Sequence, residues 1–431
     1  MFGLRLSYKS DSFEEEFQHF LSKRQVVPIE LKISVEEIIS SVREEGDEAL
    51  KKYSLEYEGS FREDFKITKE EILNSSKELD KRIFESLEFS YRRLKEYHQD
   101  CFEKIHLESL TNGIGRLIKP IESVCIYAPG GKAVYPSTIL MAAAPARVAG
   151  VRRLVLCTPN PLDNIKSLIS AATLIAGIDE LYFLGGAQSI AAMAIGTQTV
   201  DRVDKIVGPG NKYVSEAKRQ LYGEVGLDSI AGPSEIVILA SEASNPEKVA
   251  WDLMAQSEHD QDATSVVISD SKNLLSEVRH VISREIGSLK RGKIIQESLL
   301  RNGAEIYIKD NKDALPIINK IAPEHLHIAF DDKELSKKEL IAGVILIGED
   351  SANAFSDYVV GPSHILPTSS SARFSSPLSV EDFLINSSII ELNAEQNPEY
   401  FNELILHTSR LAEAEGLEAH SKSVEIRKIK T

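Results

Sequence analysis

The fold of this chain is decided by one short stretch, Val124-Cys125-Ile126-Tyr127-Ala128-Pro129-Gly130-Gly131. Its leading apolar residues predict a buried strand, and the proline and glycines that follow predict a tight turn. A helix of small residues is expected next, from about Ser137 to Val148, and Gly150 ends it. Strand, glycine turn and helix in this order form the repeating unit of a parallel sheet with right-handed crossovers.

The same unit recurs directly after this stretch. Further strands are expected at residues 154–157, 180–184 and 205–207, and two of them lead into glycine turns, Gly185-Gly186-Ala187-Gln188 and Gly208-Pro209-Gly210-Asn211. A second series of strands, alternating with helices, is expected at residues 236–239, 265–268, 305–308, 327–330 and 344–347. We therefore predict an α/β fold with two incomplete, Rossmann-like parallel-sheet domains.

The two ends of the chain are predicted to be mostly helical, unlike the alternating strands and helices between them. Residues 1–22 are expected to form a helical, acidic N-terminal arm, and the pattern from Val35 to Arg116 is helical and heavily charged. After Ser379 the chain is predicted to be mostly helical again, which indicates a helical C-terminal module.

Composition excludes several classes of function. The chain has 431 residues, 42% of them hydrophobic and 27% charged, as expected for a globular protein of two or more domains. Its net charge of −16 and the lack of a long basic run argue against nucleic acid and anionic membranes as partners. Neither a secretory signal nor a long apolar span is visible. The three cysteines have no CxxC spacing, which fits a reducing cytoplasm.

A first candidate site lies at the end of a predicted helix that starts at the N-cap Asn245. Gln256 and His259 are three residues apart and would project from one face of this helix. An amide oxygen and an imidazole nitrogen side by side are half of a metal site. The pair alone is also compatible with solvated or capping side chains.

Other acid–imidazole pairs follow. Glu324 and His325 come directly after Pro323 and just before a predicted strand, and a carboxylate and an imidazole are the commonest general bases. The loop that contains Asp357 and His364 offers hard-to-borderline ligands suited to zinc, and Glu415 and His420 form a third such pair. Each pair taken alone could equally be exposed and polar.

The glycine turns are candidates for an anionic ligand. In open parallel sheets, ligands bind beyond the carboxyl ends of the strands, where backbone amides and helix N-termini are exposed. The turns after residues 127, 184 and 207 could cradle a pyrophosphate, although none has the GxGxxG fingerprint and each could be a simple tight turn.

Together these stretches resemble the histidinol dehydrogenase family, from roughly Lys23 to the C-terminus. Seven motifs occur in the family's order: Tyr127-Ala128-Pro129-Gly130-Gly131, Gly208-Pro209-Gly210-Asn211, Ala231-Gly232-Pro233-Ser234-Glu235, Gln256-Ser257-Glu258-His259-Asp260, Ala322-Pro323-Glu324-His325-Leu326, Gly361-Pro362-Ser363-His364 and Glu415-Gly416-Leu417-Glu418-Ala419-His420. The resemblance implies a two-step, NAD-dependent oxidation of L-histidinol to L-histidine through L-histidinal, the last steps of histidine biosynthesis, with one zinc ion per subunit.

The resemblance also implies roles for individual residues. It implies that Glu324 and His325 are the catalytic pair, with His325 as the base of the first step and Glu324 as the activator of water in the second. It implies that zinc is held by Gln256, His259, Asp357 and His420. It implies substrate contacts from these four residues and from Ser234, His325, His364 and Glu415. It implies NAD contacts from Tyr127, Gln188 and Asn211.

The resemblance further implies a cytoplasmic homodimer in which Glu415 and His420 enter the partner's active site. The sequence alone would equally allow the C-terminal module to fold back on its own chain. The implied parts are an N-terminal arm (1–22), a catalytic, metal-binding domain (23–126 with 236–378), an NAD-binding domain (127–235) and a dimerisation module (379–431).

Three positions depart from the family pattern. Ala128 stands where a larger apolar residue is common, Ser369-Ser370-Ser371 where glycine is common, and Gln261-Asp262 where a proline-containing turn is usual. Two other functions stay open from the residues: a zinc hydrolase that uses the same ligands with Glu324 as base, and a binding protein on a degenerate dehydrogenase scaffold. A hydrolase would leave the glycine turns without a ligand.

Overall fold

The computed structural model describes residues 2–22, 28–59, 61–105, 108–111, 113–130, 135–331 and 337–429. Gly131, from the first glycine turn, lies outside this described part. The chain forms two compact units: residues 1–102 with 121–383, and residues 103–120 with 384–431. No helix in the described part is long and apolar enough to cross a membrane.

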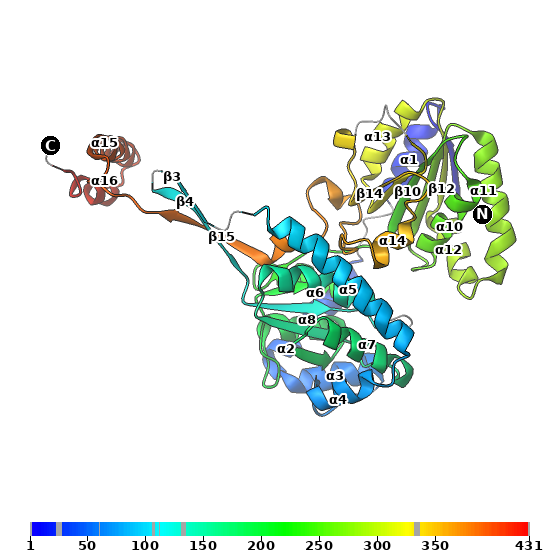
Figure 1. The fold of residues 1–431 in the computed structure, drawn as a ribbon, viewed down its shortest axis with the longest axis horizontal. Coiled ribbons are helices and arrows are strands. Elements are labelled where there is room, and N and C mark those ends of the chain that lie inside the picture. Colours follow the sequence, from blue (N-terminus) through cyan, green and yellow to red (C-terminus); the bar gives the residue numbers. More distant parts are fainter. Residues whose placement is uncertain are drawn as a thin grey trace. The chain divides into compact units, whose positions relative to one another are not determined.

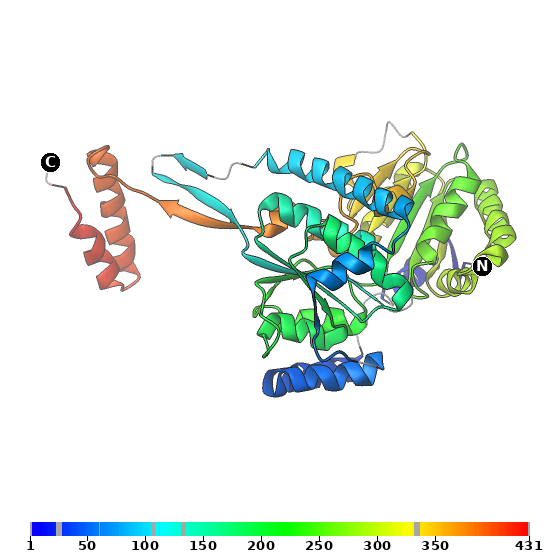
Figure 2. The same cartoon turned by 60° about the horizontal axis from the view of Figure 1, so that its bottom comes forward.

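The first unit contains two six-stranded sheets (Figures 1 and 2). The sheet built around the fold-deciding stretch, called here the β5 sheet, has the order β2-β7-β6-β5-β8-β9. Its strands are β2 (Lys66–Ile67), β7 (Glu180–Phe183), β6 (Arg153–Thr158), β5 (Ser123–Tyr127), β8 (Lys205–Val207) and β9 (Gly226–Leu227). All neighbours are parallel except β2, which pairs with β7 in the antiparallel sense.

Helices cover both faces of the β5 sheet. The helices of this half are α2 (Ile29–Glu45), α3 (Asp47–Glu58), α4 (Lys69–Ser76), α5 (Lys81–Phe102), α6 (Pro136–Ala149), α7 (Asp163–Ile175), α8 (Gly186–Ile195) and α9 (Lys212–Leu221), of which α4 and α5 pack on other helices. α2 packs against α8 and α9, whereas α5 packs against α6. Alternate strand residues such as Cys125 and Tyr127 join α2, α8 and α9 in one core. The expected strand–turn–helix units are thus confirmed.

The second sheet, called here the β10 sheet, is entirely parallel, with the order β1-β12-β11-β10-β13-β14. Its strands are β1 (Leu4–Ser7), β12 (Ala304–Tyr307), β11 (Thr264–Ser269), β10 (Glu235–Ala240), β13 (His325–Ile328) and β14 (Val344–Ile347). The helices of this half are α1 (Phe13–Ser22), α10 (Pro246–Ser257), α11 (Lys272–Glu285), α12 (Gly292–Asn302), α13 (Ala314–Ile321) and α14 (Asn353–Tyr358). One core joins the sheet to α1 and α13, and another joins it to α10, α11 and α12.

The α/β class and the parallel sheets are confirmed, and several local details differ from expectation. β13 begins at His325 rather than at His327, because His325 already pairs with Ile236 of β10. The helix that starts after Asn245 ends at Ser257, so His259 lies just beyond it. Residues 4–7 of the expected helical arm form strand β1 at the edge of the β10 sheet.

The second unit is not entirely helical. A three-stranded antiparallel sheet has the order β15-β4-β3, formed by Leu384–Ile390, Ile114–Pro120 and Glu108–Thr111. Two helices follow, α15 (Pro398–Ala414) and α16 (Glu418–Glu425), which pack against each other. The helical interpretation of residues 108–111 and 114–116 was wrong, because β3 and β4 form an antiparallel pair and β4 also pairs with the distant β15, a partner that local periodicity does not reveal.

Candidate active site

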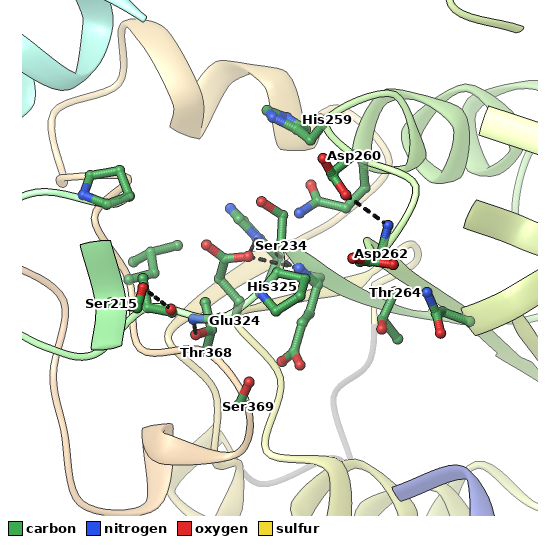
Figure 3. Close-up of a pocket in the computed structure, with 18 of the residues that line it drawn as sticks. Ser215, Ser234, His259, Asp260, Asp262, Thr264, Glu324, His325, Thr368 and Ser369 are labelled. Carbon is green, nitrogen blue, oxygen red and sulfur yellow. Dashed lines mark hydrogen bonds and ion pairs between the residues drawn. The ribbon is translucent and has the colours of Figure 1, made fainter. Parts of the chain in front are cut away.

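A cavity of about 1480 Å³ lies in the first unit and is lined by residues of both six-stranded halves (Figure 3). Pro129, Pro209 and Asn211 contribute from the β5 half. The β10 half contributes six of the predicted site residues: Ser234, Gln256, His259, Glu324, His325 and Asp357. His364 lines the same cavity. The structure therefore brings together most of the side chains that the sequence pointed to.

The backbone of Glu235 holds the acid–base pair. Glu235 is the first residue of β10, and its N–H donates to Oε2 of Glu324 at 2.7 Å. Its carbonyl oxygen accepts from Nδ1 of His325 at 3.1 Å. Because a carbonyl only accepts, Nδ1 carries a proton, and Nε2 is the nitrogen left to act as a base in the neutral ring. Figure 3 shows Glu324 and His325 together, with Ser234 beside them.

Charges around His325 control its protonation. Nε2 of His325 lies 3.7 Å from Oδ1 of Asp357, and Nδ1 lies 3.5 Å from Oε2 of Glu324. Burial lowers the pKa of His325, but the carboxylates of Glu324 and Asp357 outweigh it and raise that pKa to about 10. Burial raises the pKa of Asp357, but His325 outweighs it and the net direction is down. A base at this position therefore depends on the charge state of two neighbouring carboxylates.

His364 is held in one tautomer. Its Nδ1 lies 2.9 Å from the carbonyl oxygen of Asp357, which can only accept, so Nδ1 is the donor. Its Nε2 lies 3.0 Å from Oγ1 of Thr138, at the start of α6. Burial lowers the pKa of His364. The ring is therefore suited to hydrogen bonding in its neutral form.

The predicted metal ligands of the first unit all line the cavity. Gln256, in the last turn of α10, is buried, and its Oε1 accepts from Nδ2 of Asn353 at 2.8 Å. The His259 ring faces that of Tyr135, with centroids 6.3 Å apart and an interplanar angle of 16°. Within the described ranges, no three His, Cys, Asp or Glu side chains form a group that could hold a metal ion.

The chemistry of these donors nevertheless fits zinc. Gln256 offers an amide oxygen, His259 an imidazole nitrogen and Asp357 a carboxylate oxygen, all at one cavity. Of these three, His259 and Asp357 belong to the residue types counted in such groups, whereas Gln256 does not. Glu415 and His420, the remaining predicted residues, lie at the end of α15 and in α16 of the second unit, and both are exposed.

The predicted NAD residues lie at the carboxyl edge of the β5 sheet. Tyr127 ends β5, and its phenol oxygen accepts from the N–H of Gly186 at 3.2 Å. Asn211 caps α9 by accepting from the N–H groups of Tyr213 and Val214. Gln188 is buried in α8, and its Oε1 has no hydrogen-bond partner in the part of the chain that the structure describes. Of the three, Asn211 lines the cavity.

The carboxyl edge also carries a topological switch point. β5 lies between β6 and β8, so the order of the strands reverses beside Tyr127. Open α/β sheets bind ligands at such a point. Gly208 follows β8 with φ of +106°, and a Cβ on it would lie 2.2 Å from the carbonyl oxygen of Tyr127. The glycine is therefore required for the close approach of these two turns.

The structure gives a physical account of one departure from the family pattern. Ser369 and Ser370 have φ of +52° and +67°, a left-handed conformation that favours glycine. Ser370 donates to the carbonyl oxygen of Ile321 at 2.8 Å, which helps to hold this loop. The two other departures are compatible with the fold: Ala128 is buried, and Gln261 and Asp262 line the cavity.

Sequence reasoning missed several residues of the site. Glu235 was part of a quoted motif, but only its neighbour Ser234 was assigned a role. Asn353 and Thr138 were not singled out, since their partners lie 97 and 226 positions away. A buried ion pair, Lys218–Asp228, was missed for the same kind of reason: it fixes Gly208, whose N–H donates to Asp228 and whose carbonyl accepts from Lys218. No local pattern marks such contacts.

Comparison with known proteins gives a consistent result. The family model described as histidinol dehydrogenase matches residues 22–428. Similar relatives include the histidinol dehydrogenases of Bacillus cereus, 41% identical over 96% of this chain and 98% of the relative, and of Agrobacterium fabrum, 41% identical over 98% of each. The crystal structure of histidinol dehydrogenase from Elizabethkingia anophelis matches with a TM-score of 0.89 at 29% identity, covering 98% of this chain and 97% of that one. These similarities extend over both compact units.

Proposed function

Because the chain belongs to the histidinol dehydrogenase family, we propose that it oxidises L-histidinol to L-histidine in two NAD-dependent steps, with L-histidinal bound between them. Family membership makes the chain an oxidoreductase of histidine biosynthesis. It gives no support to the alternatives of a zinc hydrolase or a non-catalytic binding protein. The observation that carries the proposal is the bracing of Glu324 and His325 by the backbone of Glu235 inside one cavity.

The two catalytic side chains have separate proposed roles. His325 in its neutral form takes the alcohol proton on Nε2 as hydride leaves the carbinol carbon, because Nδ1 is committed to the Glu235 carbonyl. This role requires that the charges of Glu324 and Asp357, which raise the pKa of His325, be compensated in the loaded site. Glu324 activates the water that adds to the aldehyde, since a carboxylate is a natural acceptor for that proton. After His325 has released the first proton to solvent, it serves again as the base of the second step, in which the hydrate of the aldehyde loses a proton to His325 and a hydride to a second NAD.

Zinc is proposed as the resident metal, one ion per subunit. Gln256, His259 and Asp357 of one subunit and His420 of a second subunit would hold it. When bound, zinc would supply a Lewis acid that fixes the substrate's amine and imidazole and is itself redox-silent. Ser234, His364 and Glu415 would contact the substrate, and the neutral ring of His364 suits that task.

NAD is the proposed hydride acceptor, with contacts from Tyr127, Gln188 and Asn211. The position of Tyr127 at the switch point of the β5 sheet supports this placement. The proposed domain roles are NAD binding for residues 127–235 and chemistry for residues 23–126 with 236–378, of which the helices α2 and α3 pack in the β5 half. Residues 1–22, proposed as an arm, join the β10 half through β1 and α1. A reducing cytoplasm is the proposed location, in keeping with three cysteines that form no disulfide.

A homodimer is proposed, with residues 379–431 as the dimerisation module. The second compact unit, taken by itself, exposes large apolar side chains: Ile390 (69%), Leu411 (65%) and Ile426 (78%). Exposed large apolar side chains of this kind are candidates for an interaction surface, and a second copy of the chain is the partner that would also deliver Glu415 and His420. An exchanged terminal module is a low-cost route to such a dimer.

Two inactive variants test the whole proposal. Gln256→Ala and His420→Ala, unfolded together and refolded into mixed dimers, should recover NADH production from L-histidinol. One site of each mixed dimer then combines an intact Gln256 with an intact His420, whereas the other site carries both changes. Each variant refolded alone is the control. A demonstrably mixed dimer without activity would rule out the shared site, and a wild-type protein that produces no NADH would rule out the reaction.

A further inference from the structure

Asn353 is a buried residue next to the proposed metal ligands. It is the first residue of α14, four positions before Asp357, and only 1% of its surface is exposed. Its Nδ2 donates to Oε1 of Gln256 at 2.8 Å, so it connects the helix of one proposed ligand to the helix of another. Its own Oδ1 is buried without a hydrogen-bond partner among the described residues. A buried polar atom in that state is costly and calls for an explanation.

The chemistry of a glutamine ligand supplies an explanation for the unpaired oxygen atom of Asn353. A primary amide has an oxygen end and a nitrogen end, and only the oxygen can bind a metal ion. In the structure, the oxygen end of Gln256 is directed at Asn353. If the amide turns over so that Oε1 faces a cation, Nε2 faces Asn353 instead and needs an acceptor. Oδ1 of Asn353 becomes the acceptor at that place when the Asn353 amide turns over as well, because its Nδ2 faces Gln256 in the structure.

We propose that Asn353 is the positioning residue for Gln256: its Oδ1 accepts from Nε2 and thereby holds Oε1 toward the metal. The inference rests on the proposed zinc site and adds to it the group that selects which end of the amide meets the ion. Metal ligands are generally oriented in this way by a second layer of hydrogen bonds.

Zinc affinity of the full-length protein, stripped of metal and titrated in competition with a coloured chelator, is the measurement. Asn353→Leu keeps the shape of the side chain but removes the acceptor, and should weaken zinc binding by about 10- to 100-fold. Asn353→Asp keeps an acceptor and removes the donor, so its zinc affinity should stay at or above that of the wild type. A loss in Asn353→Asp as large as in Asn353→Leu would overturn the proposal, because donation would then be what matters.

A second experiment, made in the Gln256→Glu protein, tests whether Asn353 orients the side chain at position 256 or only packs against it. In Gln256→Glu the ligand has an oxygen at each end, so no partner is needed to choose between them. Adding Asn353→Leu there should change zinc affinity by less than about twofold, the scatter expected of independent sites. An equal loss in both backgrounds would overturn the proposal.

A matched asparagine controls for stability. Asn319 in α13 makes one hydrogen bond through each end of its amide, to the carbonyl of Glu339 and from the N–H of Ile341. Asn319→Leu should destabilise the fold without weakening zinc binding, which shows that destabilisation alone is not the cause. Gln256→Ala separates the two proposals: if it leaves zinc affinity unchanged, the zinc site itself fails, whereas if it weakens binding and Asn353→Leu does not, only the role of Asn353 fails.

Discussion

The candidate functional residues lie at the carboxyl ends of the strands in the β5 sheet but at the amino ends of the strands in the β10 sheet. In the β5 sheet, the candidate residues follow the carboxyl ends of strands, where α8 begins at Gly186 and α9 at Lys212. In the β10 sheet they lie at the amino ends of strands: Glu235 opens β10 and His325 opens β13. The C-terminal end of α10 brings Gln256 to that same edge, because a helix between parallel strands runs back toward their amino ends.

This difference has an electrostatic consequence. Helix N-termini carry a partial positive charge and C-termini a partial negative one, each worth about 0.3–1 kcal/mol to an ion of opposite sign. The carboxyl edge of the β5 sheet therefore suits the pyrophosphate of a dinucleotide. The amino edge of the β10 sheet, with the end of α10, suits a cation such as a metal ion or an ammonium group. The two sheets, used from opposite edges, would thus give the two proposed sites opposite polarity.

The two edges are also built from different chemical groups. At the β5 edge, the turn at Gly208 approaches the backbone of Tyr127 and is held from behind by Lys218 and Asp228. The β10 edge depends on side chains, and its chemistry should therefore be the more sensitive to single substitutions.

The largest effect is expected at the β10 edge. His325→Ala should lower the rate of histidinol oxidation by roughly 10²–10⁴, the usual worth of a positioned base. Glu324→Gln should chiefly slow conversion of the aldehyde to the acid, measured by supplying L-histidinal directly. His280→Ala, an exposed histidine of α11, is the control and should leave the rate unchanged. Equal damage to both half-reactions by Glu324→Gln would contradict the division of roles.

A comparable effect, on stability rather than on chemistry, is expected at the β5 edge. Lys218→Met should lower the free energy of unfolding by about 3–5 kcal/mol, because it leaves the buried carboxylate of Asp228 unpaired. The variant also removes the hydrogen bond from Lys218 to the carbonyl of Gly208, and the loosened turn should raise the KM for NAD. Denaturant unfolding and steady-state kinetics measure the two effects.

An exposed ion pair of the same half gives the matched control. Arg43 and Glu224 are 2.7 Å apart, and each side chain is 48% exposed. Arg43→Met should cost less than about 1 kcal/mol, as is typical of surface pairs. If Lys218→Met and Arg43→Met were equally stable, the buried Lys218–Asp228 pair would not be what fixes the turn at Gly208.

A pair of capping asparagines allows a direct comparison of the two sheets. Asn211 caps α9 and Asn245 caps α10, each by accepting two backbone N–H bonds. Either change to alanine should lower the free energy of unfolding by about 1 kcal/mol. Only Asn211→Ala should also raise the KM for NAD, since Asn211 lines the cavity and Asn245 does not. An unchanged KM would remove Asn211 from the proposed NAD contacts.

The smallest effect is expected in the serine loop beside the β10 edge. Ser369→Gly should raise the free energy of unfolding by up to about 1 kcal/mol, because a left-handed residue without a Cβ is less strained. Ser371→Gly is the control, since Ser371 has no positive φ and its hydroxyl donates to the Thr368 carbonyl. Ser371→Gly should instead lower the free energy of unfolding, and thermal unfolding of both variants measures the two effects.

The strand–turn–helix units of this fold and the family of the chain can both be predicted from the order of the residues. Runs such as Val124 to Tyr127 predict buried strands because burial has a local period, and glycine and proline mark the turns between them. The ordered motifs identified many of the residues that line one cavity, although Tyr127, Glu415 and His420 do not line it. Short or exposed strands escaped, among them Lys66–Ile67 and Leu384–Ile390, since nothing in their local pattern distinguishes them from loop or helix.

The folded chain alone shows which sheet edges meet and which groups hold the active side chains in place. The bonds from Glu235 to Glu324 and His325 span 89 and 90 positions, and the bond from Asn353 to Gln256 spans 97. Such contacts depend on strand order and on the direction of each helix, and these are set by the packing of the whole unit. A local sequence pattern encodes burial and turns, but it holds no information about which distant partner a polar group will find.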